Sequence, residues 1–201
     1  MQHLKPILFA SALLFSLNNA HSENWINGDN GKTQGLIKDN KKQGAWVEKY
    51  ENGSIKSQTQ WLDGIKHGDH MKWFINGSIA LINHYELGKL DGEQTWYWPD
   101  GTIKKKAFYS EGKLQGGFVE FYRNGNKKME ALYSDDHAQG QVTWWHENGN
   151  IWQKGEYFLG KRHGLFEEFN ENAKLVFSGI FNHGIINEYQ SQQFTDQRLS
   201  N

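Results

Sequence analysis

The residues of this sequence best suited to chemistry are its nine histidines. His67 and His70 lie three residues apart with Asp69 between them, and such a set can hold a metal ion when a fold brings its members together. Two histidines and one carboxylate on a turn are a weak signal, because protein zinc sites use three or four ligands. We therefore expect no metal site, and a rim of solvated histidines along one edge of the fold: His67, His137, His163 and His183.

A pair of carboxylates would be another route to catalysis. Glu48, Glu120 and Glu168 recur at multiples of 24 residues, and two carboxyl groups within about 10 Å can hydrolyse a glycosidic bond. If every 24 residues contribute two strands to one sheet, the nearest of these glutamates lie about 19 Å apart, which is too far. The sequence also lacks a Gly-x-Ser-x-Gly elbow, a phosphate-binding glycine loop and a His-Glu-x-x-His helix. We predict no enzymatic activity, no catalytic residue and no cofactor.

Composition excludes further classes of protein. None of the 201 residues is cysteine, which rules out disulfides, thiol catalysis and cysteine-ligated metals. A formal net charge of −1 argues against nucleic acid as a partner, because a surface that binds nucleic acid must neutralise phosphates. The abundant residues are instead glycine, with 22 copies, and tryptophan, with nine.

Residues 1–22 have the pattern of a secretory signal peptide. Lys5 supplies the positive charge, a largely apolar stretch runs from Ile7 to Leu17, and small residues follow, with cleavage expected after Ala20 or Ser22. This stretch is too short to span a bilayer, which needs about 20 residues, and no second one follows. We expect a periplasmic or secreted protein with no integral membrane segment once the signal is removed.

From residue 44 to residue 187 the chain divides without insertion into six units of 24 residues. Unit position 1 is glycine throughout, positions 9 and 10 are Asn-Gly or Asp-Gly in five units, and position 21 is glycine in five units. Asn-Gly between apolar runs is the strongest short-range hairpin signal. Each unit therefore predicts two strands and two tight turns, and the whole predicts an all-β fold: an elongated single-layer antiparallel β-meander of tandem hairpin repeats.

A two-residue Asn-Gly turn pairs position 7 with 12, 5 with 14 and 3 with 16, and paired residues share one face of the sheet. Aromatic residues dominate positions 7 and 18, isoleucine dominates position 12, and position 16 is small in four of the six units. We expect this face to form the core. A three-residue turn, for which Pro99-Asp100-Gly101 is also suited, would shift the register by one residue.

The opposite face carries the candidate binding residues. Position 6 is aromatic in five of six units and is expected to lie across from position 13, where lysines recur. Successive units lie about 9.6 Å apart, so these side chains would form a ladder along the sheet. In one interpretation the lysine stems cover the rings and stiffen the sheet; in the other the row is a groove for an extended ligand or partner. The residues are Trp73, Tyr97, Phe121, Trp145 and Phe169, with Lys104, Lys128 and Trp152 across from them.

The sequence predicts a cap at each end of the array, because the terminal units of repeat proteins usually depart from the repeat consensus. Residues 23–43 contain a decayed unit, in which Trp25-Ile26-Asn27-Gly28 is similar to residues 73–77, and Asn40 replaces the glycine of the second turn. Residues 188–201 supply one more strand, from Glu188 to Phe194, followed by a disordered tail.

The unit Gly-x-x-x-x-aromatic-aromatic-x-Asn-Gly, followed by aromatic-x-x-Gly-Lys-x-x-Gly, resembles the variant MORN repeat of bacterial YwqK-type antitoxin proteins. Residues 85–92 and 157–164 show the second part best. The resemblance implies an elongated antiparallel sheet of hairpins that serves as a binding or scaffolding module, with no catalytic residue in the repeat.

These features predict a non-catalytic exported repeat scaffold that binds a protein partner in the cell envelope through the aromatic and lysine face. One alternative is a glycan or cell-wall binding module, because rings at regular intervals suit the faces of sugars. Another is an immunity or antitoxin-like protein.

Overall fold

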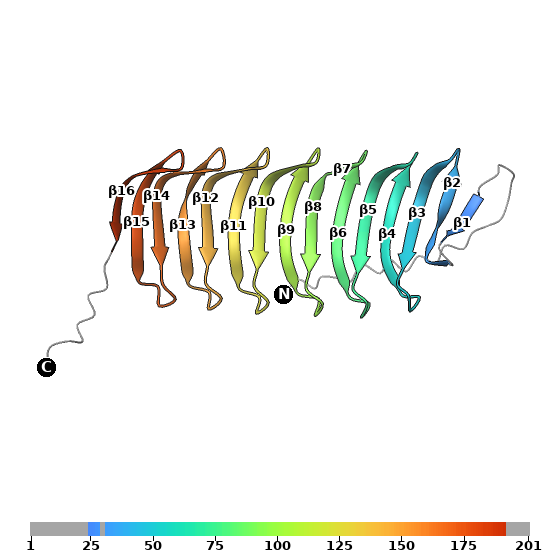
Figure 1. Ribbon diagram of the computed structural model, residues 1–201, viewed down its shortest axis with the longest axis horizontal. Helices are drawn as coiled ribbons and strands as arrows, with labels where there is room; N and C mark the ends of the chain where they lie inside the picture. The colour runs from blue at the N-terminus through green and yellow to red at the C-terminus, as the bar shows by residue number, and fades with distance from the viewer. Residues whose placement is uncertain (1–23, 29–30, 192–201) are drawn as a thin grey trace, which may run out of the picture.

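The computed structural model describes residues 24–28 and 31–191. In the described residues, sixteen strands form one open antiparallel sheet in which strands adjacent in sequence pair with each other, except that β7 and β8 both pair with β6 (Figure 1). The predicted all-β, single-layer meander of hairpins is confirmed. The expected signal peptide (residues 1–22), the last three residues of the expected capping strand (192–194) and the expected tail (195–201) lie outside the described residues.

The strands follow one another along the chain with short turns between them. They are β1 (Asn24–Gly28), β2 (Thr33–Lys38), β3 (Lys41–Lys49), β4 (Ile55–Leu62), β5 (Ile65–Trp73), β6 (Ile79–Glu86), β7 (Lys89–Leu90), β8 (Gly92–Tyr97), β9 (Ile103–Ser110), β10 (Lys113–Phe121), β11 (Lys127–Ser134), β12 (His137–Trp145), β13 (Ile151–Phe158), β14 (Lys161–Phe169), β15 (Leu175–Asn182) and β16 (Ile185–Ser191).

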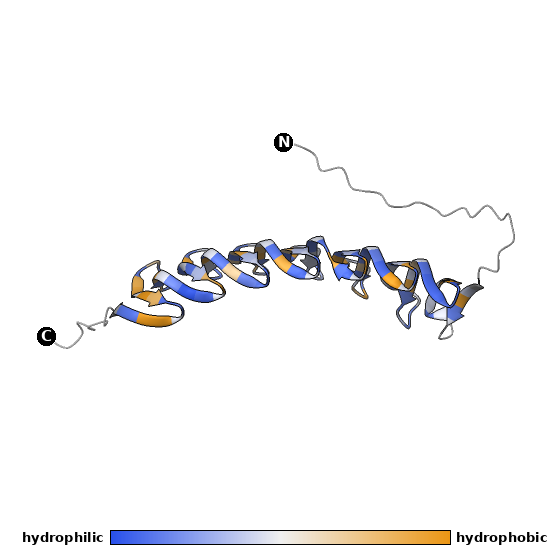
Figure 2. Cartoon of the chain, turned by 90° about the horizontal axis from the view of Figure 1, so that it is seen from above, coloured by the Kyte–Doolittle hydropathy of each residue, from blue (hydrophilic) through white to orange (hydrophobic). Residues whose placement is uncertain are grey.

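Seen along the strands, the row of hairpins is gently arched, and apolar and polar residues alternate within the single layer (Figure 2). The described part of the chain contains no helix that is long and apolar enough to cross a membrane.

The first turn of each unit differs from the predicted two-residue turn. In the first unit the Tyr50 amide donates to Ser54 O (2.8 Å), the Gly53 amide donates to Tyr50 O (2.9 Å), and Gly53 has positive φ while Asn52 does not. This is a three-residue loop, in which a type I turn is followed by a glycine in the left-handed region. The same pair of bonds closes this turn in all six units.

The two-residue turn lies instead at unit positions 20 and 21. Both residues have positive φ in all six units, as in Leu87 (44°) and Gly88 (85°), which is the geometry of a type I′ turn. Asp136, which replaces glycine in the fourth unit, adopts the same conformation with φ of 67°. In the N-terminal cap Asp39 and Asn40 form the equivalent turn.

Asparagine is therefore favoured at position 9 for its side chain. Asn124 Oδ1 accepts the backbone N–H of Asn126 (2.9 Å), and Asn124 Nδ2 donates to Glu147 O in the next unit (2.7 Å). In the third unit Asp100 cannot donate, and Arg123 Nε lies 3.6 Å from its Oδ2 instead. Each of these side chains fixes its own turn and ties that turn to the following unit.

The three-residue loop leaves the predicted strand pairing of the core positions unchanged. Positions 5 and 14 pair, as do positions 3 and 16, which confirms that part of the prediction; an example is Glu48 with Ser57. The predicted pairs 7 with 12 and 6 with 13 are wrong, because position 6 pairs with position 12, as in Lys49 with Ile55. A β-bulge between positions 5 and 6 absorbs the extra residue of the loop in every unit.

A second irregularity bends the strands at the start of each unit. The glycine at position 1 has positive φ in all six units. Around Gly68, Thr59 pairs with His70 but Trp61 pairs with Lys66, so β5 contains two extra residues there. Glu188 occupies this position after the last unit, and the register between β15 and β16 shifts by only one residue. Because residues other than glycine rarely adopt this conformation, the repeat geometry ends at Glu188.

Most buried residues lie at positions 3 and 16, which form a continuous row that we call the core row. Large and small side chains alternate along it: the Trp46 ring lies over Gly35, and the Phe166 ring lies over Gly155. The row is polar from Thr59 to Gln94 and apolar from Ala107 onward. The polar residues are Thr59, His70, Asn83 and Gln94, each buried.

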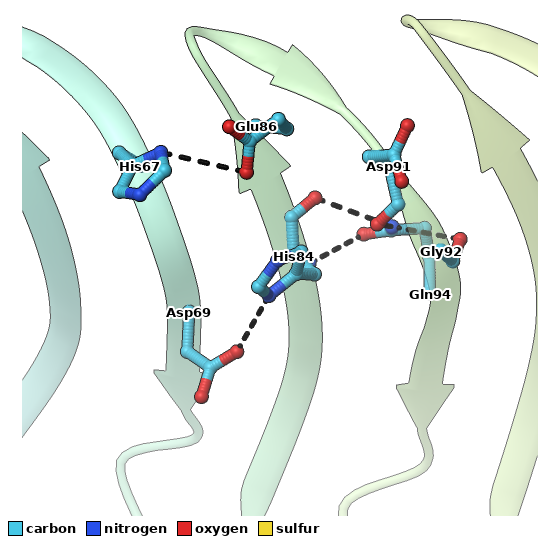
Figure 3. Close-up of polar contacts among 7 residues, drawn as sticks. All are labelled: His67, Asp69, His84, Glu86, Asp91, Gly92 and Gln94. Carbon is cyan, nitrogen blue, oxygen red and sulfur yellow. Dashed lines mark hydrogen bonds and ion pairs between the residues drawn. The ribbon is translucent and has the colours of Figure 1, made fainter.

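Gln94 shows how a buried polar residue is accommodated. Its Oε1 accepts the His84 N–H (3.0 Å), and its Nε2 donates to Asp91 O and Gly92 O (3.1 Å each) (Figure 3). The side chain thereby bridges the break between the short strand β7 and β8, where backbone pairing with β6 is interrupted.

We predict that Gly155→Ala destabilises the protein by about 1–3 kcal/mol through overpacking, because an added Cβ would lie 2.2 Å from the Phe166 ring. Gly117→Ala is the matched control. A Cβ there meets no atom within 4 Å, so we expect a change of less than about 1 kcal/mol, toward higher stability. Urea unfolding of both variants measures this difference, and equal effects would contradict the packing of the core row.

Candidate binding surfaces

The histidine set at residues 67–70 does not converge on one point. Asp69 Oδ1 lies 3.0 Å from His84 Nδ1, and His67 Nδ1 lies 3.6 Å from Glu86 Oε2 (Figure 3). His70 is buried in the core row on the other face, because side chains alternate along a strand. Within the described ranges, no group of three or more His, Cys, Asp and Glu residues is arranged to hold a metal ion.

The expected rim of histidines is only partly assembled. His163 and His183 lie together with ring centroids 5.4 Å apart, and both contact the Phe158 ring, at 6.0 and 5.9 Å. His137 Nδ1 is 2.6 Å from Asp135 O, a contact within its own turn. These side chains pack locally at the edge formed by the second turns.

Each of the three glutamates at position 5 contacts the side chain of a nearby lysine or tryptophan. Glu48 Oε1 accepts from Lys56 Nζ (2.7 Å), which holds the pKa of Glu48 below its ordinary value. Glu120 pairs with Lys128 (3.2 Å), and Glu168 Oε1 accepts from the Trp152 indole. A general acid needs a raised pKa, so the lowered pKa of Glu48 does not suit that role.

The five aromatic residues predicted as a binding row are all half-buried: Trp73, Tyr97, Phe121, Trp145 and Phe169. Their backbone carbonyls take part in contacts between units. Trp73 O accepts from the Tyr50 hydroxyl (2.7 Å), and Trp145 O accepts from the Tyr122 hydroxyl (2.8 Å). The residue at position 7 is thus used to hold the next unit in place.

The lysines and Trp152 at position 13 contact position 7, one residue away from the expected partner. Lys104 Nζ lies 4.5 Å from the Trp98 ring centroid, and Lys128 Nζ lies 6.0 Å from the Tyr122 ring. The Trp152 ring contacts His146 with centroids 6.2 Å apart. The bulge between positions 5 and 6 causes this displacement, so these side chains do not lie across from the predicted aromatic row.

A hollow of about 460 Å³ lies on the same face as the aromatic residues of position 6, nearer the middle of the strands. We call it the outer hollow. Gly117 leaves its centre open, and the side chains of Phe108 and Leu132 flank it while remaining 44% and 59% exposed. Its floor includes Val119. Apolar surface that stays exposed around a depression is typical of an interaction site.

Charged pairs surround this apolar centre. Lys106 Nζ lies 2.8 Å from Glu93 Oε1, and Lys127 Nζ lies 2.8 Å from Glu130 Oε1. Of these residues Glu93, Lys106 and Glu130 line the hollow directly. An apolar centre within a polar rim is the arrangement found in protein–protein interfaces.

The sequence analysis does not predict the outer hollow, although the residues at unit positions 2 and 17 indicate it. Position 2 carries a side chain in the other five units, and Gly117 is the exception with no conformational reason, since its φ is not positive. Position 17 is apolar only at Phe108, Leu132 and Ile180.

A second depression of about 350 Å³ lies on the face that carries the core row, which we call the inner face, and is lined by residues of β2 to β5. It is lined by polar and charged residues together with Trp46, Val47 and Trp61. We call it the inner pocket.

The buried imidazole of His70 lies in the wall of the inner pocket. Its Nδ1 is 2.7 Å from Thr59 Oγ1. Burial lowers the pKa of His70 to about 4, assisted by the charges of Lys66 and Lys72. His70 is therefore neutral at neutral pH.

Comparison with protein families supports the repeat interpretation. The family described as MORN repeat variant matches residues 42–63, 90–111 and 138–158. These segments begin two units apart, and the units between them form the same hairpins. The chain is thus similar to MORN-type proteins over these three segments, and it forms a β-sheet scaffold of MORN-type repeats. No curated protein matches the chain.

We predict that His70 makes folding stability depend on pH. Its folded pKa of about 4 is lower than the ordinary value of 6.5, so its contribution is fully present above pH 6.5 and is lost as the pH falls toward 4. The loss between pH 7 and 4.5 should be about 2–3 kcal/mol. His70→Gln, which introduces the residue found at the equivalent position 94, should abolish this part of the dependence in urea unfolding. The same pH dependence in both proteins would refute the assignment.

Proposed function

We propose that this protein is a non-catalytic repeat scaffold that binds a protein partner through the outer hollow. The observation that carries the proposal is the combination of Gly117, which leaves the centre open, with Phe108 and Leu132, which stay exposed around it. Binding energy in protein interfaces is concentrated where one large side chain enters such a pocket and a ring of polar contacts excludes water.

The dimensions support a side chain as the occupant. A volume of about 460 Å³ accommodates one aromatic or branched side chain together with part of its backbone. The pairs Glu93–Lys106 and Lys127–Glu130 place both signs of charge on the rim, which suits a partner with mixed polar groups. Strands on both sides hold the hollow in place, so little ordering cost accompanies binding.

The partner that we propose is a protein of the cell envelope. The basis for this is the sequence of residues 1–22, which has the composition of an export signal. Because each hairpin presents the same face, further partner contacts can extend from the outer hollow toward the aromatic row at Trp145 and Phe169.

The glycan alternative has less support. Sugars stack on open ring faces, whereas the rings of the predicted row are half-buried and lysines lie over several rings nearby. Trp152, at 41% exposure, is the most accessible of the predicted aromatic residues. No observation favours the antitoxin-like alternative.

Gly117→Leu tests the proposal directly. Leucine occupies the same unit position at residue 165, and the site has room for a Cβ, so the variant should fold and fill the hollow. We expect it to weaken partner binding by at least about tenfold, the effect of losing one buried anchor. The measurement is quantitative crosslinking to proteins of an envelope extract.

Ala45→Leu provides the matched control, because it makes a similar change at unit position 2 of the first unit, far from the hollow. The proposal requires one stoichiometric protein that is captured by the native chain and by Ala45→Leu but not by Gly117→Leu. Capture that Gly117→Leu leaves unchanged, or the absence of any stoichiometric protein, would overturn it.

A further inference from the structure

The inner pocket carries more positive charge than its surroundings neutralise. Lys42, Lys66 and Lys72 line it, and none of them has a carboxylate within ion-pair distance among the described residues. The one acidic residue in its wall, Glu48, already accepts from Lys56 (2.7 Å) and from Ser57 (3.2 Å). Three lysines therefore line a space of about 350 Å³ whose one carboxylate, Glu48, is already hydrogen-bonded to Lys56 and Ser57.

Aromatic rings hold two of these ammonium groups in position. Lys42 Nζ lies between two indoles, 4.4 Å from the Trp46 ring centroid and 4.7 Å from that of Trp61. Lys66 Nζ lies 4.8 Å from the Tyr85 ring. Such cation–π contacts restrict long side chains without removing their charge. The cations are thus positioned before any ligand arrives.

Two further features of the wall agree with a site for an anion. The field of Lys66 and Lys72 adds to burial in lowering the pKa of His70, so the positive charge acts on the interior of the wall. Trp61 Nε1 is a buried donor with no acceptor in the described part of the chain. Ser57 and Thr59 add hydroxyl groups to the lining.

We propose that the inner pocket binds a carboxylate or phosphate group of an anionic ligand, held by the ammonium groups of Lys42, Lys66 and Lys72. Charge-assisted hydrogen bonds from ammonium to oxyanion are among the strongest polar contacts in proteins. The same residues disfavour a metal cation, because the pocket offers it one carboxylate that is already paired with Lys56.

The test titrates the full protein with inorganic phosphate and, separately, with the dicarboxylate glutarate at constant ionic strength. The indole N–H signals of Trp46 and Trp61 in proton–nitrogen spectra report occupancy. The proposal expects saturable shifts of these signals with at least one of the two anions. The anion that binds more tightly identifies phosphate or carboxylate as the group of the natural ligand. Absence of saturable shifts with both anions would overturn the proposal.

Variants that each remove one positive charge distinguish binding at the inner pocket from non-specific attraction of anions to the protein. Lys72→Gln removes an exposed ammonium from the pocket and should weaken binding about tenfold, as for a lost charged hydrogen bond. Lys42→Gln should weaken anion binding to a similar extent. If Lys42→Gln does not fold, the result for Lys72→Gln alone tests the proposal. Lys113→Gln is the control, because Lys113 pairs with Asp135 on a turn outside the pocket. Equal weakening by Lys113→Gln and Lys72→Gln would contradict a specific site.

This inference does not depend on the proposed partner. The outer hollow and the inner pocket lie on opposite faces and in different units, so Gly117→Leu should leave the anion titration unchanged. Failure of one proposal is therefore separable from failure of the other.

Discussion

The stacking of large on small residues along the core row is the interaction on which the rest of this structure depends. A single-layer sheet has no second layer to cover it, so a hairpin buries its apolar surface mainly against the hairpins beside it. Phe166 over Gly155 and Trp46 over Gly35 show the fit. The turns reinforce the same order: Asn124 and Tyr122 each donate to a backbone carbonyl of the next unit. Stability in such an array is a sum of neighbour contacts.

Because neighbours supply the stability, single units can depart from the repeat without loss of the fold. The core row is polar from Thr59 to Gln94, and the inner pocket, whose wall includes His70, lies beside its first residues. Gly117 replaces a side chain on the other face, and there the outer hollow forms. Proteins typically depart from their own structural rules at functional sites. The two surfaces proposed for binding are both places where a unit departs from its consensus.

Much of the fold could be predicted from the sequence because the repeat is regular. The 24-residue spacing determines the meander, and the alternation of side chains determines the pairing of positions 3 and 16. The turn types could not be assigned, since Asn-Gly suits a two-residue turn and also a three-residue loop that ends in glycine. The bulge between positions 5 and 6 then moved Lys104 and Lys128 beside position 7. The outer hollow escaped prediction because it depends on a missing side chain and on residues from adjacent strands, which no local pattern reveals.

The most direct test of this account is the proton–nitrogen spectrum of a chain that lacks residues 116–139, one whole unit. Gln115 is then followed by Gly140, so the phase of the repeat is retained. If each hairpin depends only on its neighbours, the shortened protein folds, and the amide signals of the first and last units keep their positions. An unfolded chain, or shifts that spread to those distant units, would contradict the account.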